Sequence, residues 1–221
     1  MPASLKLFIR TRAGISLLLL IVVYLVGIIS VLMGHAQQLM LLTPFNLLFA
    51  AALMLFNAKG INLNYIIWFS VVGVAGYGME WLGIETGLVF GSYSYGAGLG
   101  IKLFDVPLLI GVNWAVLVFS VAAISRNWKT KPWLRAAGAA ALMVLYDILL
   151  EPVAIRFDFW SWEATQVPLQ NYLAWWAIAW LMLLAVNKFV PNRENFLAPY
   201  LLIIQSLFFL LLILTGNLSL F

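Results

Sequence analysis

Two carboxylates stand four residues apart in the apolar stretch "LMVLYDILLEPV". Because residues four apart share one face of a helix, Asp147 and Glu151 are expected to project side by side. A third acid, Glu80, lies in another apolar run and shares a helical stripe with Gly76 and Gly83, glycines that allow close helix approach or room for a ligand. Ionisable groups inside membrane segments are costly and usually functional. The three acids therefore predict a site of proton transfer.

A structural alternative is that these carboxylates cap neighbouring helices or pair with Lys102 and Arg156. A pair of acids with a third on another helix favours the functional interpretation.

The elements that position these acids are membrane helices. The chain has 221 residues, 65% of them hydrophobic and 9% charged, and a mean hydropathy of +1.04, which leaves too little polar surface for a water-soluble globule. Hydrocarbon about 30 Å thick takes roughly 20 apolar residues to cross in a helix. Runs of this kind cover residues 14–34, 39–56, 62–82, 106–125, 133–152, 171–190 and 198–216. They are apolar all round, unlike the alternating strands of a barrel. We expect an all-α polytopic protein with seven transmembrane helices in a single domain, 1–221, and a first helix that is too long to be a cleaved leader.

Basic residues define the orientation. Alternate loops collect ten of the twelve Lys and Arg residues on one side: Lys6, Arg10, Arg12, Lys59, Arg126, Lys129, Lys131, Arg135, Lys188 and Arg193. Only Lys102 and Arg156 fall on the other side. By the positive-inside rule the N-terminus is inside and the C-terminus outside.

The acids are distributed in the opposite sense. Glu80, Glu85, Asp105, Asp147, Glu151, Asp158 and Glu163 lie in or near the outer half, and only Glu194 is cytoplasmic. At 1.5 Å per residue, Asp147 sits roughly 8 Å below the outer edge, with Asn113 and Trp114 about 10 Å deep. Asn171, Trp175 and Trp176 open the sixth helix. Polar and aromatic groups of four helices thus share one depth near the outer surface.

Two loops on the same side are rich in aromatic residues. Residues 83–105 alternate glycines with Phe90, Tyr93 and Tyr95, and residues 153–170 contain Phe157, Phe159, Trp160 and Trp162. Glycine and tyrosine in this mixture predict an ordered lid that lays rings over a cavity. The alternative for any single ring is the aromatic belt of a membrane interface. Pro152 is interpreted as the end of the fifth helix and the start of the second loop.

Composition excludes several chemistries. His35 is the only histidine and cysteine is absent, which excludes His-rich di-iron sites and His-ligated haem and disfavours zinc hydrolysis or a Ser–His nucleophile. The last helix has no lysine for a retinal Schiff base. "GAGLG" lacks the spacing and the strand–helix context of a dinucleotide fingerprint, and the basic residues form short loops rather than a nucleic-acid patch. We expect no cofactor, no metal and no nucleic-acid partner.

Five ordered motifs carry a family resemblance. They are "EWLGIETGLVFGSYSYG" (80–96), "DVPLLIGVNWA" (105–115), "YDILLEPVA" (146–154), "FWSW" (159–162) and "VPLQNYLAWW" (167–176). In these motifs the chain resembles the membrane-bound carotenoid biosynthesis family that includes the CruF-type carotenoid 1,2-hydratases. The resemblance covers roughly half of the chain, whereas the first, second and last helices resemble the family only in hydropathy and have no assigned roles.

The resemblance implies addition of water, without a cofactor, to the terminal C1–C2 double bond of an acyclic or monocyclic carotenoid, giving a tertiary alcohol. The expected partners are this carotenoid, water and the lipids of a bacterial or archaeal cell membrane, with the site toward the outer leaflet. The resemblance brings no catalytic assignments, so the roles follow from chemistry: protonation of C2, a tertiary cation at C1, and capture by water. A carboxylic acid surrounded by hydrocarbon stays protonated, and a second carboxylate reinforces this.

On this basis Asp147 is the expected proton donor and Glu151 or Glu80 the base that positions water. Substrate contacts are expected from these residues: Tyr93, Tyr95, Asn113, Trp114, Asp158, Trp160, Trp162, Asn171 and Trp175. Rings among them can shield the cation by about 0.5 to 2 kcal/mol each.

Three other functions stay open. A membrane carotenoid cyclase begins with the same protonation but quenches the cation with an internal double bond. A proton-coupled transporter would use the acids as a relay, although no duplicated halves are visible in the sequence. A carotenoid-binding or lipid-binding protein would return its ligand unchanged.

Overall fold

The computed structural model describes residues 11–164 and 166–217. Its helices are α2 (Arg12–Leu32), α3 (Ala36–Met40), α4 (Thr43–Asn57), α5 (Leu63–Thr86), α6 (Leu108–Ser125), α7 (Pro132–Arg156), α8 (Leu169–Phe189), α9 (Leu197–Leu212) and the π-helical turn η1 (Ile213–Asn217). Its short strands are β1 (Tyr93–Tyr95), β2 (Lys102–Leu103), β3 (Val106–Pro107) and β4 (Trp160–Trp162). The chain is therefore mostly helical, as its apolar runs predicted.

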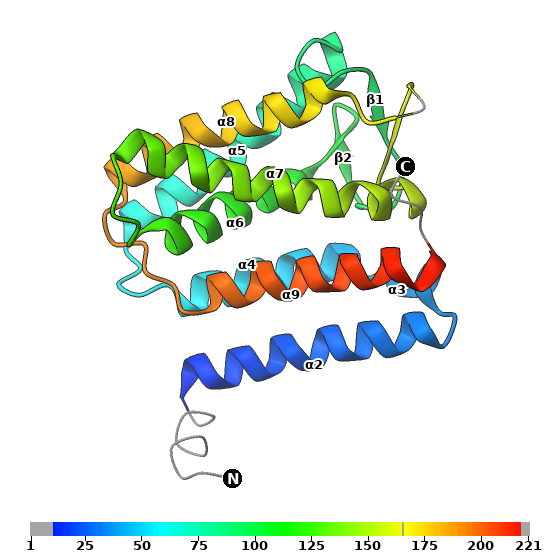
Figure 1. Ribbon diagram of the computed structural model, residues 1–221, viewed down its shortest axis with the longest axis horizontal. Coiled ribbons are helices and arrows are strands. Elements are labelled where there is room, and N and C mark those ends of the chain that lie inside the picture. The colour runs from blue at the N-terminus through cyan, green and yellow to red at the C-terminus, as the bar shows by residue number, and fades with distance from the viewer. Residues whose placement is uncertain (1–10, 165, 218–221) are drawn as a thin grey trace.

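The helices stack in three layers (Figure 1). Helices α5 to α8 form one layer, α4 and α9 lie beneath it, and α2 lies outermost against α9. Helix α6 contacts α4, α5, α7, α8 and α9, and most of its side chains are buried. This central place explains why its sequence is apolar on every side rather than on one face.

Six helices in the described part of the chain are long and apolar enough to cross a membrane: α2, α5, α6, α7, α8 and α9 with its extension to Thr215. The predicted run 39–56 instead divides into α3 and the 15-residue α4. Pro44, in the first turn of α4, explains the division, because proline has no N–H to continue a preceding helix and is preorganised to begin a new one.

Helix α7 does not end at Pro152, so that sequence interpretation was wrong. The helix continues through Pro152 to Arg156. Proline removes one backbone hydrogen bond, but membrane helices tolerate it where neighbouring helices support the freed backbone group. As a result Glu151 lies inside a continuous helix rather than at its end.

The two aromatic loops join into one small sheet. Strand β1 pairs with β4 in antiparallel register, with Tyr93 opposite Trp162, Ser94 opposite Ser161 and Tyr95 opposite Trp160. Helix α5 leads into this sheet through Gly87, whose φ of 65° closes the helix in the left-handed conformation that glycine adopts readily. The loops therefore form a joint cover at one end of the bundle.

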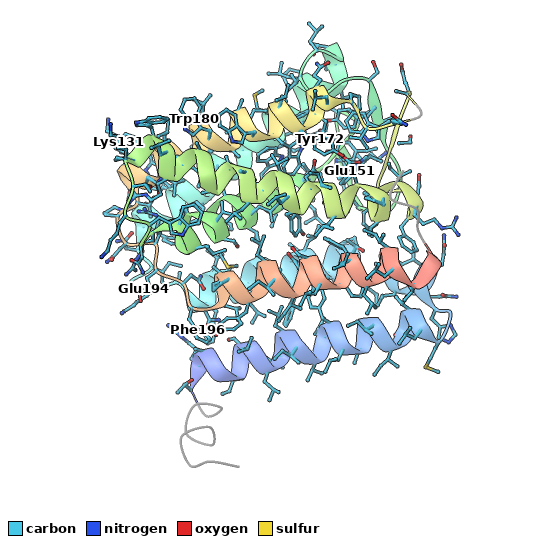
Figure 2. The ribbon with its side chains drawn as sticks, in the orientation of Figure 1. Lys131, Glu151, Tyr172, Trp180, Glu194 and Phe196 are labelled. Carbon is cyan, nitrogen blue, oxygen red and sulfur yellow. The ribbon has the colours of Figure 1, made fainter. Side chains whose placement is uncertain are left out.

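One end of the bundle is rich in basic residues, because the loops after α4, α6 and α8 carry Lys59, Arg126, Lys129, Lys131 and Arg193. Figure 2 shows Glu151 and Tyr172 toward one end and Lys131 and Glu194 at the other. At the latter end Glu194 pairs with Lys59 at 3.3 Å and with Arg126 at 2.9 Å. Of the basic residues used for the orientation, Lys6 and Arg10 lie outside the described residues. The start of α2 and the end of α9 lie at opposite ends of the bundle (Figure 1).

Candidate active site

Glu80 of α5 is held by three aromatic donors. Its Oε2 accepts hydrogen bonds from Tyr93 Oη at 2.5 Å and from Tyr95 Oη at 2.8 Å. Its Oε1 accepts one from Trp114 Nε1 of α6 at 2.8 Å. The carboxyl group is buried, and both of its oxygens are satisfied by groups that donate but carry no positive charge.

The glycines beside Glu80 make this arrangement possible. A Cβ on Gly76 would lie 2.4 Å from Trp114 Cγ, and a Cβ on Gly83 would lie 2.6 Å from Phe90 Cδ2. Both distances are shorter than real side chains tolerate. The glycine stripe is therefore filled by protein rings, which brings the indole of Trp114 against Glu80.

Asp147 and Glu151 of α7 are bridged by Asn171 of α8. The Nδ2 of Asn171 donates to Asp147 Oδ2 at 2.9 Å and to Glu151 Oε1 at 3.3 Å. Glu151 Oε2 also accepts from Trp160 Nε1 at 2.9 Å and from Trp162 Nε1 at 3.0 Å. The two acids thus share one face and one donor, as their four-residue spacing predicted.

Asp147 differs from the other two acids in its hydrogen bonding. It is fully buried, with 0% exposure, and its Oδ1 has no hydrogen-bond partner among the described residues. Glu80 and Glu151 each accept three side-chain hydrogen bonds, whereas Asp147 accepts one. One buried carboxyl oxygen is therefore left for a proton or for a ligand.

Two helical hairpins contribute matching parts to the site. In the hairpin formed by α5 and α6, Glu80 is followed by the Tyr-Ser-Tyr sequence of β1. In the hairpin formed by α7 and α8, Glu151 is followed by the Trp-Ser-Trp sequence of β4. In each hairpin the two rings of the strand donate to the carboxylate of the preceding helix. The antiparallel pairing of β1 with β4 places the two halves face to face.

A small cavity of about 20 Å³ lies between the three carboxyl groups. Its lining consists of Glu80, Phe90, Tyr93, Tyr95, Ile110, Asn113, Trp114, Asp147, Glu151, Trp160, Trp162, Asn171 and Trp175. A volume above about 10 to 15 Å³ with several polar partners is enough to hold one water molecule. The site can therefore hold a single water among three acids.

Aromatic faces enclose the rest of the site. Trp114 stacks on Trp175 with ring centroids 4.4 Å apart, and Tyr95 meets Trp160 edge to face at 6.1 Å. Rings of this kind attract cations through their faces. The aromatic lining of the site is therefore suited to stabilising positive charge.

No cation neutralises the three carboxyl groups in the described part of the chain, where both salt bridges involve Glu194. Lys102 Nζ donates instead to the backbone oxygen of Tyr95. The ion pairs with Lys102 and Arg156, which were the structural alternative, are thus not found among the described residues. Among the described residues, no cluster of three or more His, Cys, Asp or Glu side chains is arranged to hold a metal ion.

The pKa values of the two tyrosines of β1 are shifted by their surroundings. Burial raises the pKa of Tyr93 and of Tyr95 above the ordinary value of 10.0, and the neighbouring charge of Glu80 raises each further. Both phenols therefore stay protonated and able to donate at neutral pH.

The structure brings together every site residue expected from the sequence except Asp158. Asp158 is exposed on the surface, where a φ of 57° turns the chain and its Oδ2 accepts from Ala97 N at 3.0 Å. Phe90 and Ile110 line the cavity without having been expected to. Phe90 stood out as a loop ring, but nothing in the sequence distinguished Ile110 from other apolar residues of its helix.

The fold and the site together define a class of protein. It is a polytopic helical membrane protein with a buried cluster of acids under an aromatic cover. Residues 40–221 match the family described as carotenoid biosynthesis protein, and the chain belongs to that family. The resemblance noted in residues 80 to 176 is thereby confirmed, and the match extends it to α4 and α9.

A similar curated protein is the bisanhydrobacterioruberin hydratase of Haloarcula japonica, 35% identical over 107 residues. The alignment covers 45% of this chain and 36% of that protein, so this chain matches little more than a third of its relative's length. No solved structure matches the chain.

Proposed function

We propose that the protein is a carotenoid hydratase that adds water to the terminal C1–C2 double bond of an acyclic carotenoid end. The observation that carries the proposal is the set of three buried carboxyl groups around a cavity of about 20 Å³ that fits one water. None of the three is paired with a cation of the described residues. Family membership and the partial similarity to a hydratase support the substrate class.

Asp147 is the proton donor in this proposal. Hydrogen-bond donors stabilise the charged form of a carboxyl group, and Asp147 accepts one such bond where Glu80 and Glu151 accept three each. The proton of Asp147 passes to C2 as the π bond breaks, which leaves a tertiary cation at C1.

Glu151 is the base that activates water. The water oxygen bonds to C1 while one of its protons passes to Glu151, so that one molecule of water is added in total. Because Glu151 shares the Asn171 amide with Asp147, it is well placed to return the proton to the donor. The charge of Glu80 and the stacked faces of Trp114 and Trp175 stabilise the cation between these two steps.

The orientation in the membrane is part of the proposal. The carboxyl cluster faces the outer side of a bacterial or archaeal cell membrane, with the N-terminus inside, the C-terminus outside and α4 as a seventh crossing. The concentration of basic residues in the loops at the opposite end supports this. Because the chain contains no cysteine, the single thiol of Ser94→Cys is expected to react with an impermeant thiol reagent added to intact cells. Labelling only after lysis would show that the orientation is the opposite one.

The deciding experiment is expression in lycopene-accumulating cells, followed by mass analysis of the pigments. The expected product gains one or two waters, and its oxygen carries the label when the cells grow in ¹⁸O water. An isomer of unchanged mass would indicate a cyclase, and unchanged lycopene would contradict the proposal.

Variants of the acids connect the reaction to the site. Asp147→Asn is expected to lower conversion by about 10² to 10⁴-fold, the usual contribution of a positioned acid. Glu85→Gln, an exposed acid at the end of α5, is the matched control and is expected to convert like wild type. Full conversion by the single variants Asp147→Asn and Glu151→Gln and by their double variant would exclude this mechanism.

A further inference from the structure

A second and much larger cavity lies beside the carboxyl site. It has a volume of about 430 Å³, within the range of 300 to 1,000 Å³ typical of ligand pockets. Its walls come from α2, α3, α4, α6, α7 and α9, and so from all three layers of the fold. Apolar side chains such as Val26, Leu47, Leu150 and Phe208 dominate its lining.

The polar side chains in these walls are largely bound to one another. Asn46 Nδ2 donates to Tyr24 Oη at 2.9 Å, which links α4 to α2. Tyr146 Oη donates to Gln205 Oε1 at 3.2 Å, which links α7 to α9. These pairs hold the helices around the cavity and leave its interior suited to a hydrocarbon ligand.

The two cavities share a wall. Ile110, Asn113 and Trp160 line both the large apolar cavity and the small carboxyl cavity. A chain lying in the large cavity therefore has one end within a side chain's thickness of the acids. The small cavity alone has room for a water but not for the end of a carotenoid, so in the proposed reaction the reacting end must displace part of the shared wall to reach Asp147.

Asn113 is the polar group at this junction. Its side chain is partly exposed and has no hydrogen-bond partner among the described residues. An amide offers two donors and one acceptor oxygen. Asn113 is thus available to bind the attacking water or the new hydroxyl group where the chain meets the acids.

The rim of the large cavity faces lipid. Val26 of α2 and Phe45 of α4 belong to its lining and are nevertheless 56% and 70% exposed. Both lie on apolar membrane helices rather than in the aromatic cover. The opening therefore lies between α2 and α4, on the side where an apolar ligand dissolved in the membrane would arrive.

We propose that the large cavity binds the linear isoprenoid chain of the substrate, which enters from lipid between α2 and α4 and places its reacting end at Asn113. This inference rests on the proposed hydratase function and names its binding site. It gives α2, α4 and α9 a role in substrate binding that their sequences did not reveal.

The test compares two neighbouring leucines of α4. Leu47 lines the cavity, whereas Leu48 is 50% exposed and does not line it. Wild type, Leu47→Trp and Leu48→Trp are purified in detergent from lycopene-accumulating cells, and bound pigment per protein and hydrated product are measured. We expect Leu47→Trp to lower both by about tenfold, because the indole takes up cavity volume that the ligand would occupy, and Leu48→Trp to match wild type.

Size-exclusion elution shows whether Leu47→Trp folds like wild type. If it does not, Val26→Trp at the rim and Leu25→Trp outside the lining give the same comparison on α2. Asn113→Leu is expected to retain pigment but to lower its conversion, which separates positioning from binding.

The outcomes distinguish the two proposals. Normal pigment binding and hydration in correctly folded Leu47→Trp would overturn the cavity assignment and leave the hydratase function intact. Pigment that binds to wild type, is released by Leu47→Trp and is never hydrated would overturn the hydratase function and support the cavity. Absence of both binding and hydration in wild type would overturn both.

Discussion

Gly76 and Trp114 are packed so closely that a Cβ on the glycine would stand 2.4 Å from the indole Cγ. Gly76→Ala must therefore displace the indole that donates to Glu80. We expect a loss of roughly 1 to 3 kcal/mol in stability, as for other overpacked sites, together with lower hydratase activity. Thermal melting in detergent measures the first effect. Gly78→Ala on the same helix, where nothing lies within 4 Å of the new Cβ, is expected to behave like wild type.

In the proposed mechanism Asn171 positions the two acids of α7, because its amide donates to both of them. Asn171→Leu removes the donor shared by Asp147 and Glu151, so we expect kcat to fall by about tenfold or more with KM little changed. Steady-state conversion of a solubilised carotenoid separates the two constants. A rise in KM at constant kcat would assign Asn171 to substrate binding instead.

The buried phenols predict a loss of stability at alkaline pH. In the folded protein Tyr93 and Tyr95 have pKa values raised above 10.0 by burial and by the charge of Glu80, whereas the unfolded chain releases these protons near pH 10. The stabilisation is complete below pH 10 and is lost as the pH rises from there toward the folded pKa values. The melting temperature is measured at about pH 9 and about pH 11, on either side of the ordinary tyrosine pKa of about 10. The drop between them should be smaller for the double variant Tyr93→Phe and Tyr95→Phe than for wild type. An equal drop would show that other groups control the alkaline transition.

The pairing of β1 with β4 can be tested by a covalent link. Ser94 and Ser161 are direct partners with their Oγ atoms 3.3 Å apart, and the chain contains no cysteine. The double variant Ser94→Cys with Ser161→Cys is expected to form a disulfide under mild oxidation, because paired side chains this close suit its geometry. A mobility shift on non-reducing gels detects the link, and retained activity would show that the cover stays closed during turnover.

The carboxyl cluster could be predicted because its determinants are local. The spacing of Asp147 and Glu151 fixes their shared face, and helix direction brings Glu80 to the same level. Asn171 and Trp114 were predicted on the same basis. The hydrogen-bond partner of each carboxyl oxygen could not be predicted. It depends on the register of β1 with β4 and on the space beside Gly76 and Gly83, which a sequence does not display.

Other features depend on packing between distant segments. The large cavity was missed because Asn46 and Gln205 are isolated polar residues in apolar runs, and only the fold brings each to its tyrosine. Pro152 was taken for a helix end because proline disfavours a helix interior in water, a rule that membrane helices relax. Asp158 was grouped with the site as one of the acids near the outer side, but its left-handed conformation directs it to Ala97.

The matched hairpins bear on how the chain is assembled. Among the described residues, every side-chain donor to Glu80 lies between residues 93 and 114, and every donor to Asp147 and Glu151 lies between residues 160 and 171. Each pair of helices can thus enter the bilayer with its own acids already bound to their side-chain donors, without waiting for the rest of the protein to be synthesised. Joining β1 to β4 is then a late step between two preformed halves, and only this step creates the chamber in which all three acids meet.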